Sequence, residues 1–269
     1  MKKYPLFITI FLFSTVPLLL LLNGCGVFYR ARGAADIVIQ EPDSQLPPYE
    51  KLIYNVKWLG IPVGTITSSI KDIEKKDGRD AYILEVTVKT NPFCSTIYKI
   101  EDRFVSYMDV EELYTLRHEV YRREGRYKKD AITDFDQSNQ KAYFKNFIDN
   151  SEKVFNIPPR VQDTLSACYY FRLLPVKVGD NIKYTVCNNE DNYNLFCIIQ
   201  FKTFINLPKI GRRAVFQLQP YAELNGKKVK KGKVSAFFSC DKKRLPLLII
   251  IEAPLFTKII AYLSEIEYE

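Results

Sequence analysis

Hydrolysis of the serine or cysteine type would have to use His118, because the sequence has a single histidine. In such sites a histidine takes a proton from a neighbouring nucleophile while a carboxylate orients its ring. His118 stands in the strand-like stretch Leu116–Val120, between Arg117 and Glu119, and no Gly-x-Ser-x-Gly segment offers a serine. We therefore expect a surface histidine with no part in catalysis.

A second candidate for chemistry is the pair Asp134 and Asp136, which lie two positions apart on an expected strand and would point to one face. Paired carboxylates can hydrolyse glycosides, although such pairs are far more often solvated strand positions. The sequence has no His-Glu-x-x-His or paired-cysteine motif for a metal and no glycine-rich phosphate loop. The expectation is a protein that is not an enzyme and that carries no metal and no cofactor.

The N-terminal segment has the composition of an export signal. Lys2 and Lys3 precede an apolar run from Phe7 to Leu22, and the run ends in Asn-Gly followed by Cys25. This end is similar to the lipobox of bacterial lipoproteins, in which the cysteine thiol carries a diacylglycerol thioether. An uncleaved anchor is the alternative, because the run approaches the ~20 residues that cross a bilayer. Pro17 and the abrupt polar end favour cleavage.

We therefore expect a signal peptide at 1–24, a tether at 25–48 and one β-rich domain at 49–269. Lipidation of Cys25 would place the protein in the cell envelope, on a membrane by its lipid anchor. Gly26 rather than aspartate follows this cysteine, which fits the outer membrane, facing the periplasm, by the enterobacterial sorting rule.

The net charge is +8, and export argues against nucleic acid as its partner. Basic side chains gather at 122–129, at 227–233 and at 242–244. Two interpretations stay open for these clusters: solvated lysines at hairpin turns, or contacts with an anionic lipid headgroup or an acidic glycan.

Six cysteines occur, and with Cys25 lipidated an odd number remains, so at least one stays free. Cys187 and Cys197 flank a polar stretch and could face each other across a hairpin. They are the first candidates for a disulfide, and buried free thiols fit as well.

Strand patterns fill most of the chain after Pro48, with alternating apolar positions as in Ala81–Val88. The expected strands are Leu52–Trp58, Thr65–Ile70, Ala81–Val88, Ile97–Met108, Leu113–Arg122, Tyr127–Phe135, Lys141–Phe147, Lys153–Ile157, Asn181–Cys187, Leu195–Ile205, Arg213–Glu223, Lys233–Ser239, Leu247–Glu252 and Thr257–Tyr268. An antiparallel sheet with this many strands must curl.

One segment has the pattern of a helix. Asp163 is a favourable N-cap, and Pro175 would end the run that follows it. Helical spacing places four residues on one face, Leu165, Cys168, Tyr169 and Leu173. We expect this helix to fill the concave face of the curled sheet; packing on an outer edge is the alternative.

Three motifs then occur in order along the chain. They are Tyr54-x-Val56-x-Trp58-x-Gly60-Ile61-x-x-Gly64, Asp163-Thr164-Leu165-Ser166-x-x-Tyr169-x-x-Arg172 and Ser239-x-Asp241-x-x-Arg244-x-Pro246. Together they resemble the bacterial domain-of-unknown-function family numbered 3108, from about Tyr49 to the C-terminus. The resemblance implies a mainly β fold, a half-barrel or open barrel wrapped around one central helix, similar to lipoprotein carriers and receptors such as the Lol proteins.

The motif residues also have plain structural roles. Gly60 and Gly64 suit a turn with a positive φ or a close backbone approach, and Trp58 is an expected core anchor. Arg172 suits the helix dipole. Asp241 and Arg244 could close a turn through a surface salt bridge.

The function that fits best is a non-catalytic binding module for a lipid or other hydrophobic ligand. Trp58, Leu165, Tyr169 and Leu173 are the candidate ligand-binding residues, because pockets of this kind are lined by aromatic and aliphatic side chains. The alternative is a structural or assembly factor that docks another envelope protein or a polysaccharide.

Overall fold

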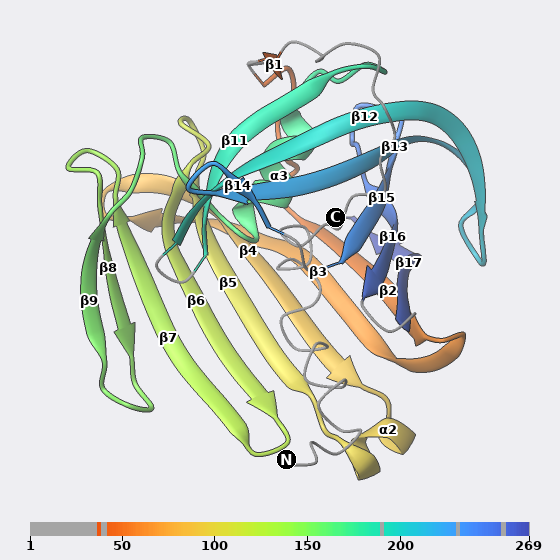
Figure 1. The fold of residues 1–269 in the computed structure, drawn as a ribbon, viewed down its shortest axis with the longest axis horizontal. Helices are drawn as coiled ribbons and strands as arrows, with labels where there is room; N and C mark the ends of the chain where they lie inside the picture. Colours follow the sequence, from red (N-terminus) through yellow and green to blue (C-terminus); the bar gives the residue numbers. More distant parts are fainter. Residues whose placement is uncertain (1–36, 39–41, 189–190, 230–231, 254–256, 269) are drawn as a thin grey trace.

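The computed structural model describes residues 37–38, 42–188, 191–229, 232–253 and 257–268, and within them the strands form one 17-stranded sheet. Figure 1 shows this sheet curled into an open half-barrel with α3 (Ser166–Leu173) on its inner side. The expected fold, a curled antiparallel sheet around one central helix, is confirmed. The signal peptide, Cys25 and most of the expected tether lie outside the described residues.

The strands follow one another around the sheet almost in chain order. They are β1 (Ile37–Val38), β2 (Glu50–Trp58), β3 (Ile61–Lys76), β4 (Arg79–Thr90), β5 (Glu101–Asp109), β6 (Thr115–Glu124), β7 (Tyr127–Asp136), β8 (Lys141–Asn146), β9 (Glu152–Asn156), β10 (Gln162–Asp163), β11 (Asn181–Asn188), β12 (Asp191–Leu207), β13 (Gly211–Leu224), β14 (Lys227–Lys228), β15 (Lys233–Ser239), β16 (Pro246–Ala253) and β17 (Thr257–Glu267). The last strand, β17, pairs with β2 and so joins the C-terminal half of the sheet to the N-terminal half. The sheet stays open, with β9 at one end of the strand order and β1 and β10 at the other.

Alternation of side chains decides which face of each strand turns inward. On β2, Leu52, Tyr54 and Val56 are buried, while the residues between them are only partly buried. The register places Ala261 of β17 opposite Val56, so the inward faces of neighbouring strands line up. A one-residue shift would turn these apolar side chains to the outer face.

Both faces of α3 are buried in the core. Leu165, just before the helix, and Tyr169 pack with residues of β2–β4, β16 and β17. On the other face Phe171 packs with residues of β11–β13 and β15. The helix is therefore enclosed between the two halves of the curled sheet. No helix in the described residues is both long and apolar enough to cross a bilayer.

A second helix, α2 (Pro92–Ile97), differs from the expected strand Ile97–Met108. The side chain of Asn91 caps it by accepting a hydrogen bond from the backbone N–H of Cys94 at 2.8 Å. Proline stands in its first turn, where its missing N–H costs nothing. These signals end β4 and delay the next strand until Glu101.

Residues 42–48, which the sequence places in the tether, pack against the domain. The backbone N–H of Asp43 donates to the carbonyl of Leu173 at 2.9 Å, and Leu46 is buried in the core. All core clusters lie between Leu46 and Leu263. The chain from residue 26 onwards therefore contains all the core clusters of the described residues.

Of the two possibilities left open for Cys187 and Cys197, a disulfide or thiols without one, the structure has the second, and the described cysteines form no disulfide. Strand register explains this, because Cys187 pairs with Asn192 and Cys197 pairs with Ile182. The polar stretch between the cysteines is not a symmetric hairpin loop; most of it is paired strand.

Glycine is required at positions 60 and 64 for two different reasons. Gly60 adopts φ +87° in the β2–β3 turn, a conformation that side chains with a Cβ adopt rarely. At Gly64 an added Cβ would lie 2.2 Å from the carbonyl oxygen of Lys89 on β4. The close approach of β3 to β4 thus requires a glycine at this position.

Candidate functional site

A cavity lies between α3 and the inner face of the sheet. It measures about 100 Å³, or about 1100 Å³ when the space at its open mouth is included. Its wall is almost entirely apolar and is formed by Leu52, Tyr54, Val56, Ile66, Ser68, Val86, Phe104, Thr164, Leu165, Cys168, Tyr169, Arg172, Ala236, Phe238, Pro246, Ile249, Ile251, Ile259 and Ala261. Helical spacing presents Leu165, Cys168, Tyr169 and Arg172 to this cavity.

Arg172 is the one charged residue that lines this cavity, and it pairs with Glu50, which does not line it. Arg172 and Glu50 form two hydrogen bonds, from Nη1 to Oε1 at 2.6 Å and from Nη2 to Oε2 at 2.8 Å. Their side chains are 3% and 0% exposed. Because Glu50 neutralises Arg172 in bidentate geometry, the cavity wall carries no net charge from this pair.

Arg172 is also held from behind by the β15–β16 turn. Its Nε donates to the carbonyl of Lys243 at 3.1 Å, and Arg244 donates to the carbonyl of Arg172 at 3.0 Å. Arg244 pairs with Asp43 at 3.1 Å, which differs from the ion pair with Asp241 that the sequence suggests. Asp241 instead accepts hydrogen bonds from Ser239 and from the backbone of Lys243.

Two tyrosines line the cavity, and their hydroxyl groups differ in their hydrogen bonds. Tyr169 Oη shares a hydrogen bond with Ser68 Oγ at 2.8 Å. Tyr54 Oη is buried and has no hydrogen-bond partner in the described residues. Burial raises the pKa of both hydroxyls, so each remains protonated and able to donate. An unpaired buried hydroxyl costs free energy unless a ligand or water accepts its proton.

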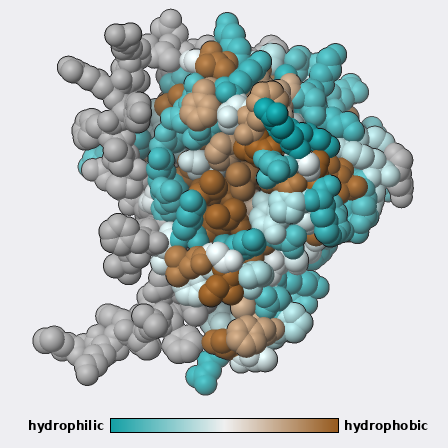
Figure 2. All heavy atoms as spheres, turned by 90° about the vertical axis from the view of Figure 1, so that its right-hand side faces the viewer, coloured by the Kyte–Doolittle hydropathy of each residue, from teal (hydrophilic) through white to brown (hydrophobic). Residues whose placement is uncertain are grey.

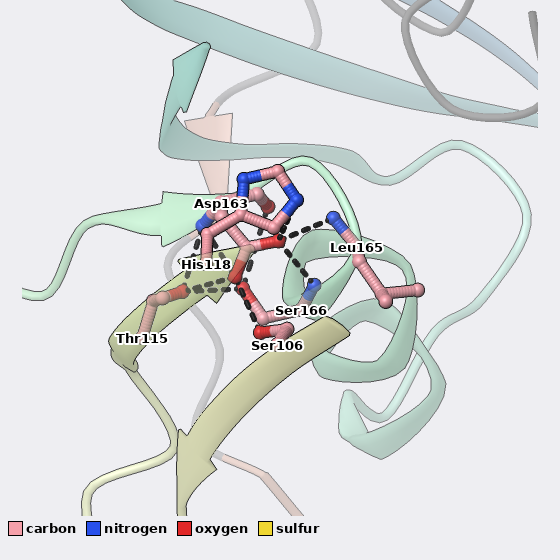
Figure 3. Close-up of polar contacts among 6 residues, drawn as sticks. All are labelled: Ser106, Thr115, His118, Asp163, Leu165 and Ser166. Atoms are coloured by element: carbon pink, nitrogen blue, oxygen red, sulfur yellow. Dashed lines mark hydrogen bonds and ion pairs between the residues drawn. The ribbon is translucent and has the colours of Figure 1, made fainter. Parts of the chain in front are cut away.

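The N-terminal end of α3 is held by a buried carboxylate (Figure 3). Asp163 Oδ1 accepts from the backbone N–H of Leu165 at 2.6 Å and of Ser166 at 3.1 Å. Its Oδ2 accepts from Ser106 Oγ at 2.5 Å and from Thr115 Oγ1 at 2.9 Å. Asp163 thus ties the helix to the two strands β5 and β6.

His118 lies beside this carboxylate, and the expectation of a surface histidine is wrong. Its side chain is 13% exposed, and Nε2 lies 3.9 Å from Asp163 Oδ1. Burial lowers the pKa of His118. The hydroxyl of Ser106 donates to Asp163 and not to the imidazole, so the order of contacts needed for a Ser-His-Asp nucleophile is not present.

The other side chains that could take part in catalysis are held in structural contacts or are buried. Asp134 pairs with Arg117 at 2.6 Å, and Asp136 accepts from Asn139 in the following turn. Burial raises the pKa of the Cys168 thiol, which disfavours a thiolate nucleophile. Among the described residues no group of three or more His, Cys, Asp or Glu side chains gathers as a metal site.

Of the four candidate ligand-binding residues, the structure brings Leu165 and Tyr169 into the cavity. Trp58 lines a separate apolar cavity of about 100 Å³ near α2. Leu173 is buried in the core and borders a third space with Lys242 and Lys243.

Sequence reasoning missed Glu50 and the free hydroxyl of Tyr54. Glu50 lies 122 positions from Arg172 in the chain, so no local pattern links the two. Tyr54 did stand out as the first residue of a motif, yet only burial without a partner marks its hydroxyl as available.

A second buried acidic group lies outside the cavity, where Asp102 and Glu124 are each 1% exposed. Arg122 pairs with Glu124, and the backbone N–H of Arg123 donates to Asp102 at 2.8 Å. Burial together with the neighbouring Glu124 raises the pKa of Asp102 to about 7. Asp102 is therefore largely protonated in mildly acidic solution and loses its proton near neutrality.

Comparison with known proteins gives a family and a fold. A family model described as "Protein of unknown function (DUF3108)" matches residues 53–257. No curated protein sequence matches. The crystal structure of a β-barrel-like protein of domain of unknown function DUF1849 from Brucella abortus superposes with a TM-score of 0.54 at 4% identity, covering 83% of this chain and 100% of that chain.

Two more crystal structures match with lower scores. One is described as a putative lipoprotein from Parabacteroides distasonis, with a TM-score of 0.32 and 8% identity. The other is described as a putative exported protein with a YmcC-like fold from Bacteroides fragilis, with a TM-score of 0.30 and 9% identity. Each match covers 86% of this chain and 100% of the other. The match to the DUF1849 structure, with its TM-score of 0.54, is the one of the three that supports the barrel-like fold.

The buried pair predicts a specific pattern of stabilities. Glu50→Leu leaves Arg172 charged and unpaired in the core, and Arg172→Met does the same to Glu50, so each should lower the free energy of unfolding by about 3–5 kcal/mol. The double variant removes both charges and should recover most of that loss. Denaturant unfolding measures all four proteins; additive losses in the double variant would contradict the pairing.

Asp102 predicts a pH dependence of opposite sign to ordinary acid denaturation. Its folded pKa of about 7 lies above the usual value of 3.8, so its contribution to stability is full below about pH 4 and is lost as pH rises through 7. Asp102→Asn keeps an acceptor for Arg123 and removes the charge. The variant should gain stability relative to the natural protein between pH 5 and pH 8 by about 1–3 kcal/mol. A difference that stays constant over this range would disprove the assignment.

Proposed function

The chain belongs to the family described as "Protein of unknown function (DUF3108)", and we propose that it holds the acyl chain of an uncharged lipid between α3 and the sheet, by binding and not by catalysis. The observation that carries the proposal is the apolar cavity with one unpaired donor, Tyr54 Oη, in its wall. A filled core at this place would have left no room for a ligand.

The size of the cavity suits one part of a chain molecule. An apolar cavity of about 150 Å³ admits benzene, so about 100 Å³ accommodates a few methylene groups without any movement. The open mouth lets a longer chain continue out of the enclosed part. Aliphatic walls favour such a chain because they remove apolar surface from water.

The wall also restricts the charge of the ligand. Its one charged residue, Arg172, is already paired with Glu50, so a buried carboxylate on the ligand would find no free cation there. A buried unpaired charge costs far more than a neutral polar group. An ester or amide carbonyl, in contrast, can accept the hydrogen bond that Tyr54 has to give.

The cellular setting of the proposal comes from the sequence. Lipidation of Cys25 would keep the domain in the envelope, with the outer membrane as the expected site. A fully extended chain from Cys25 to Ile37, where β1 joins the sheet, would reach at most about 40 Å, which allows the domain to lie close to the membrane that holds the anchor.

Filling the cavity should abolish binding. Ala261 lines it, and Ala261→Phe adds a volume close to that of the cavity without removing a polar contact. The chain from residue 26 onwards, purified from the periplasm and extracted with solvent, should yield copurifying lipid by mass spectrometry, and the variant should yield at least about tenfold less. Ala214→Phe, at an exposed position of the β12–β13 hairpin, is the matched control and should keep its lipid. Lipid-free natural protein, or equal recovery from Ala261→Phe, would refute the proposal.

Tyr54 predicts which headgroup chemistry binds best. A fluorescent fatty-acid methyl ester should bind more tightly than the corresponding free acid at pH 8, and Tyr54→Phe should weaken ester binding about 5–10-fold through loss of one hydrogen bond. Tyr82→Phe is the control, since the Tyr82 hydroxyl bonds the carbonyl of Leu46 and does not line the cavity. Tighter binding of the free acid would show that the ligand is anionic.

A further inference from the structure

Large apolar side chains are exposed along one edge of the β2–β9 part of the sheet. They belong to the β2–β3 turn, to α2 and to the β8–β9 turn, and we call this edge the apolar rim: Leu59, Ile61, Phe93, Ile97, Phe147 and Ile148, between 49% and 73% exposed. Figure 1 shows these turns following one another along one edge of the half-barrel. Figure 2 shows apolar side chains reaching the lower surface on the side of the β2–β3 turn.

Backbone contacts hold neighbouring parts of the rim together. Asn91 bonds the carbonyls of Pro62 and Val63 and so fixes α2 beside the β2–β3 turn. Gly125 of the β6–β7 turn donates to the carbonyl of Lys99 at 2.8 Å. These contacts make the rim a fixed surface of the domain.

The opposite edge of the same strands has a different character. Its turns are β3–β4 near Asp77, β5–β6 near Glu111 and Glu112, and β7–β8 near Asn139. None of these described turns exposes a large apolar side chain. The apolar surface is therefore a property of one edge, which general surface composition does not explain.

Basic side chains lie at and beside the apolar rim, together with the exposed carboxylate of Asp149 in the β8–β9 turn. Arg126 and Lys128 in and beside the β6–β7 turn, and Lys258 beside the β2–β3 turn, are exposed, and the described residues offer them no salt-bridge partner. Lysine and arginine beside exposed apolar groups attract anionic headgroups, while the apolar groups enter the interface.

An apolar cavity opens at this rim. Trp58, Val63, Ile97 and Tyr98 help to line its space of about 100 Å³. Trp58 and Val63 belong to strands β2 and β3, whose inner residues Tyr54 and Ile66 line the cavity under α3. The rim thus lies at one end of the apolar inner face.

We propose that the apolar rim docks on the surface of an anionic phospholipid bilayer, with Phe93, Ile97, Phe147 and Ile148 entering the headgroup region and Arg126 and Lys128 contacting phosphates. This contact is made by the folded domain itself and is separate from any anchor at Cys25. It does not depend on whether the cavity under α3 holds a lipid.

The test uses the chain from residue 26 onwards, which lacks the lipidated cysteine, in sedimentation with sucrose-loaded vesicles. Vesicles of phosphatidylcholine with about one third phosphatidylglycerol should bind the protein, and pure phosphatidylcholine should bind it less. Phe93→Ser with Ile97→Ser should lower the partition coefficient about tenfold or more. Phe201→Ser with Phe204→Ser, at aromatic side chains of β12 that are also exposed (46% and 60%), should leave it unchanged.

Charge-reversal variants measure the electrostatic contribution to vesicle binding separately from the apolar contribution. Arg126→Glu with Lys128→Glu should weaken binding to the anionic vesicles by about 30-fold, whereas Lys141→Glu with Lys177→Glu, the same change of net charge at exposed positions elsewhere, should have a much smaller effect. Absence of vesicle binding by the natural chain, or equal losses in the rim and control variants, would overturn the proposal. Unfolding midpoints equal to that of the natural chain exclude misfolding as the cause.

Discussion

Helix α3 is held inside the curled sheet by a buried carboxylate at each end, and the rest of the site depends on this double attachment. At its start Asp163 accepts four hydrogen bonds, two from the helix backbone and two from strands β5 and β6. At its end Arg172 meets Glu50 of β2. An isolated helix of this length would be marginal in water, so these contacts and the packing of both its faces define its position.

Such an arrangement explains why a cavity persists beside a well-packed core. The hydrogen bonds of Asp163 and Arg172 fix the position of the helix. The curvature of the sheet fixes the distance between the helix and the inner face of the sheet. The side chains that face the helix from the sheet include small ones, such as Ala236 and Ala261, and these do not fill the space between the helix and the sheet. At the C-terminal end of α3, Arg172 and Glu50 neutralise each other. Among the residues that line the apolar space, Tyr54 has a buried hydroxyl with no hydrogen-bond partner in the described residues.

Periodicity and capping predicted the architecture because both are local signals. The alternation in β4 and the stop at Pro175 each act over a few residues. The expected N-cap at Asp163 is wrong by two positions, because the N-cap of α3 is Leu165; Asp163 still accepts hydrogen bonds from the backbone N–H groups of Leu165 and Ser166. His118, Arg244 and Glu50 were not predictable in the same way, because their partners lie in distant segments brought together only by the sheet. The α2 helix did carry a local signal in Asn91 and Pro92, which the apolar run after it obscured. Strand register, which separates Cys187 from Cys197, depends on the whole hairpin and not on the spacing of two residues.

Binding of an acyl chain under α3 is tested most directly by a crystal structure of the chain from residue 26 onwards grown with a fatty-acid methyl ester. We predict electron density for the acyl chain between α3 and the inner face of β2, β3, β16 and β17, with the ester carbonyl within hydrogen-bond distance of Tyr54 Oη. A cavity closed by its own side chains, or an ester bound elsewhere with Tyr54 still unpaired, would contradict it.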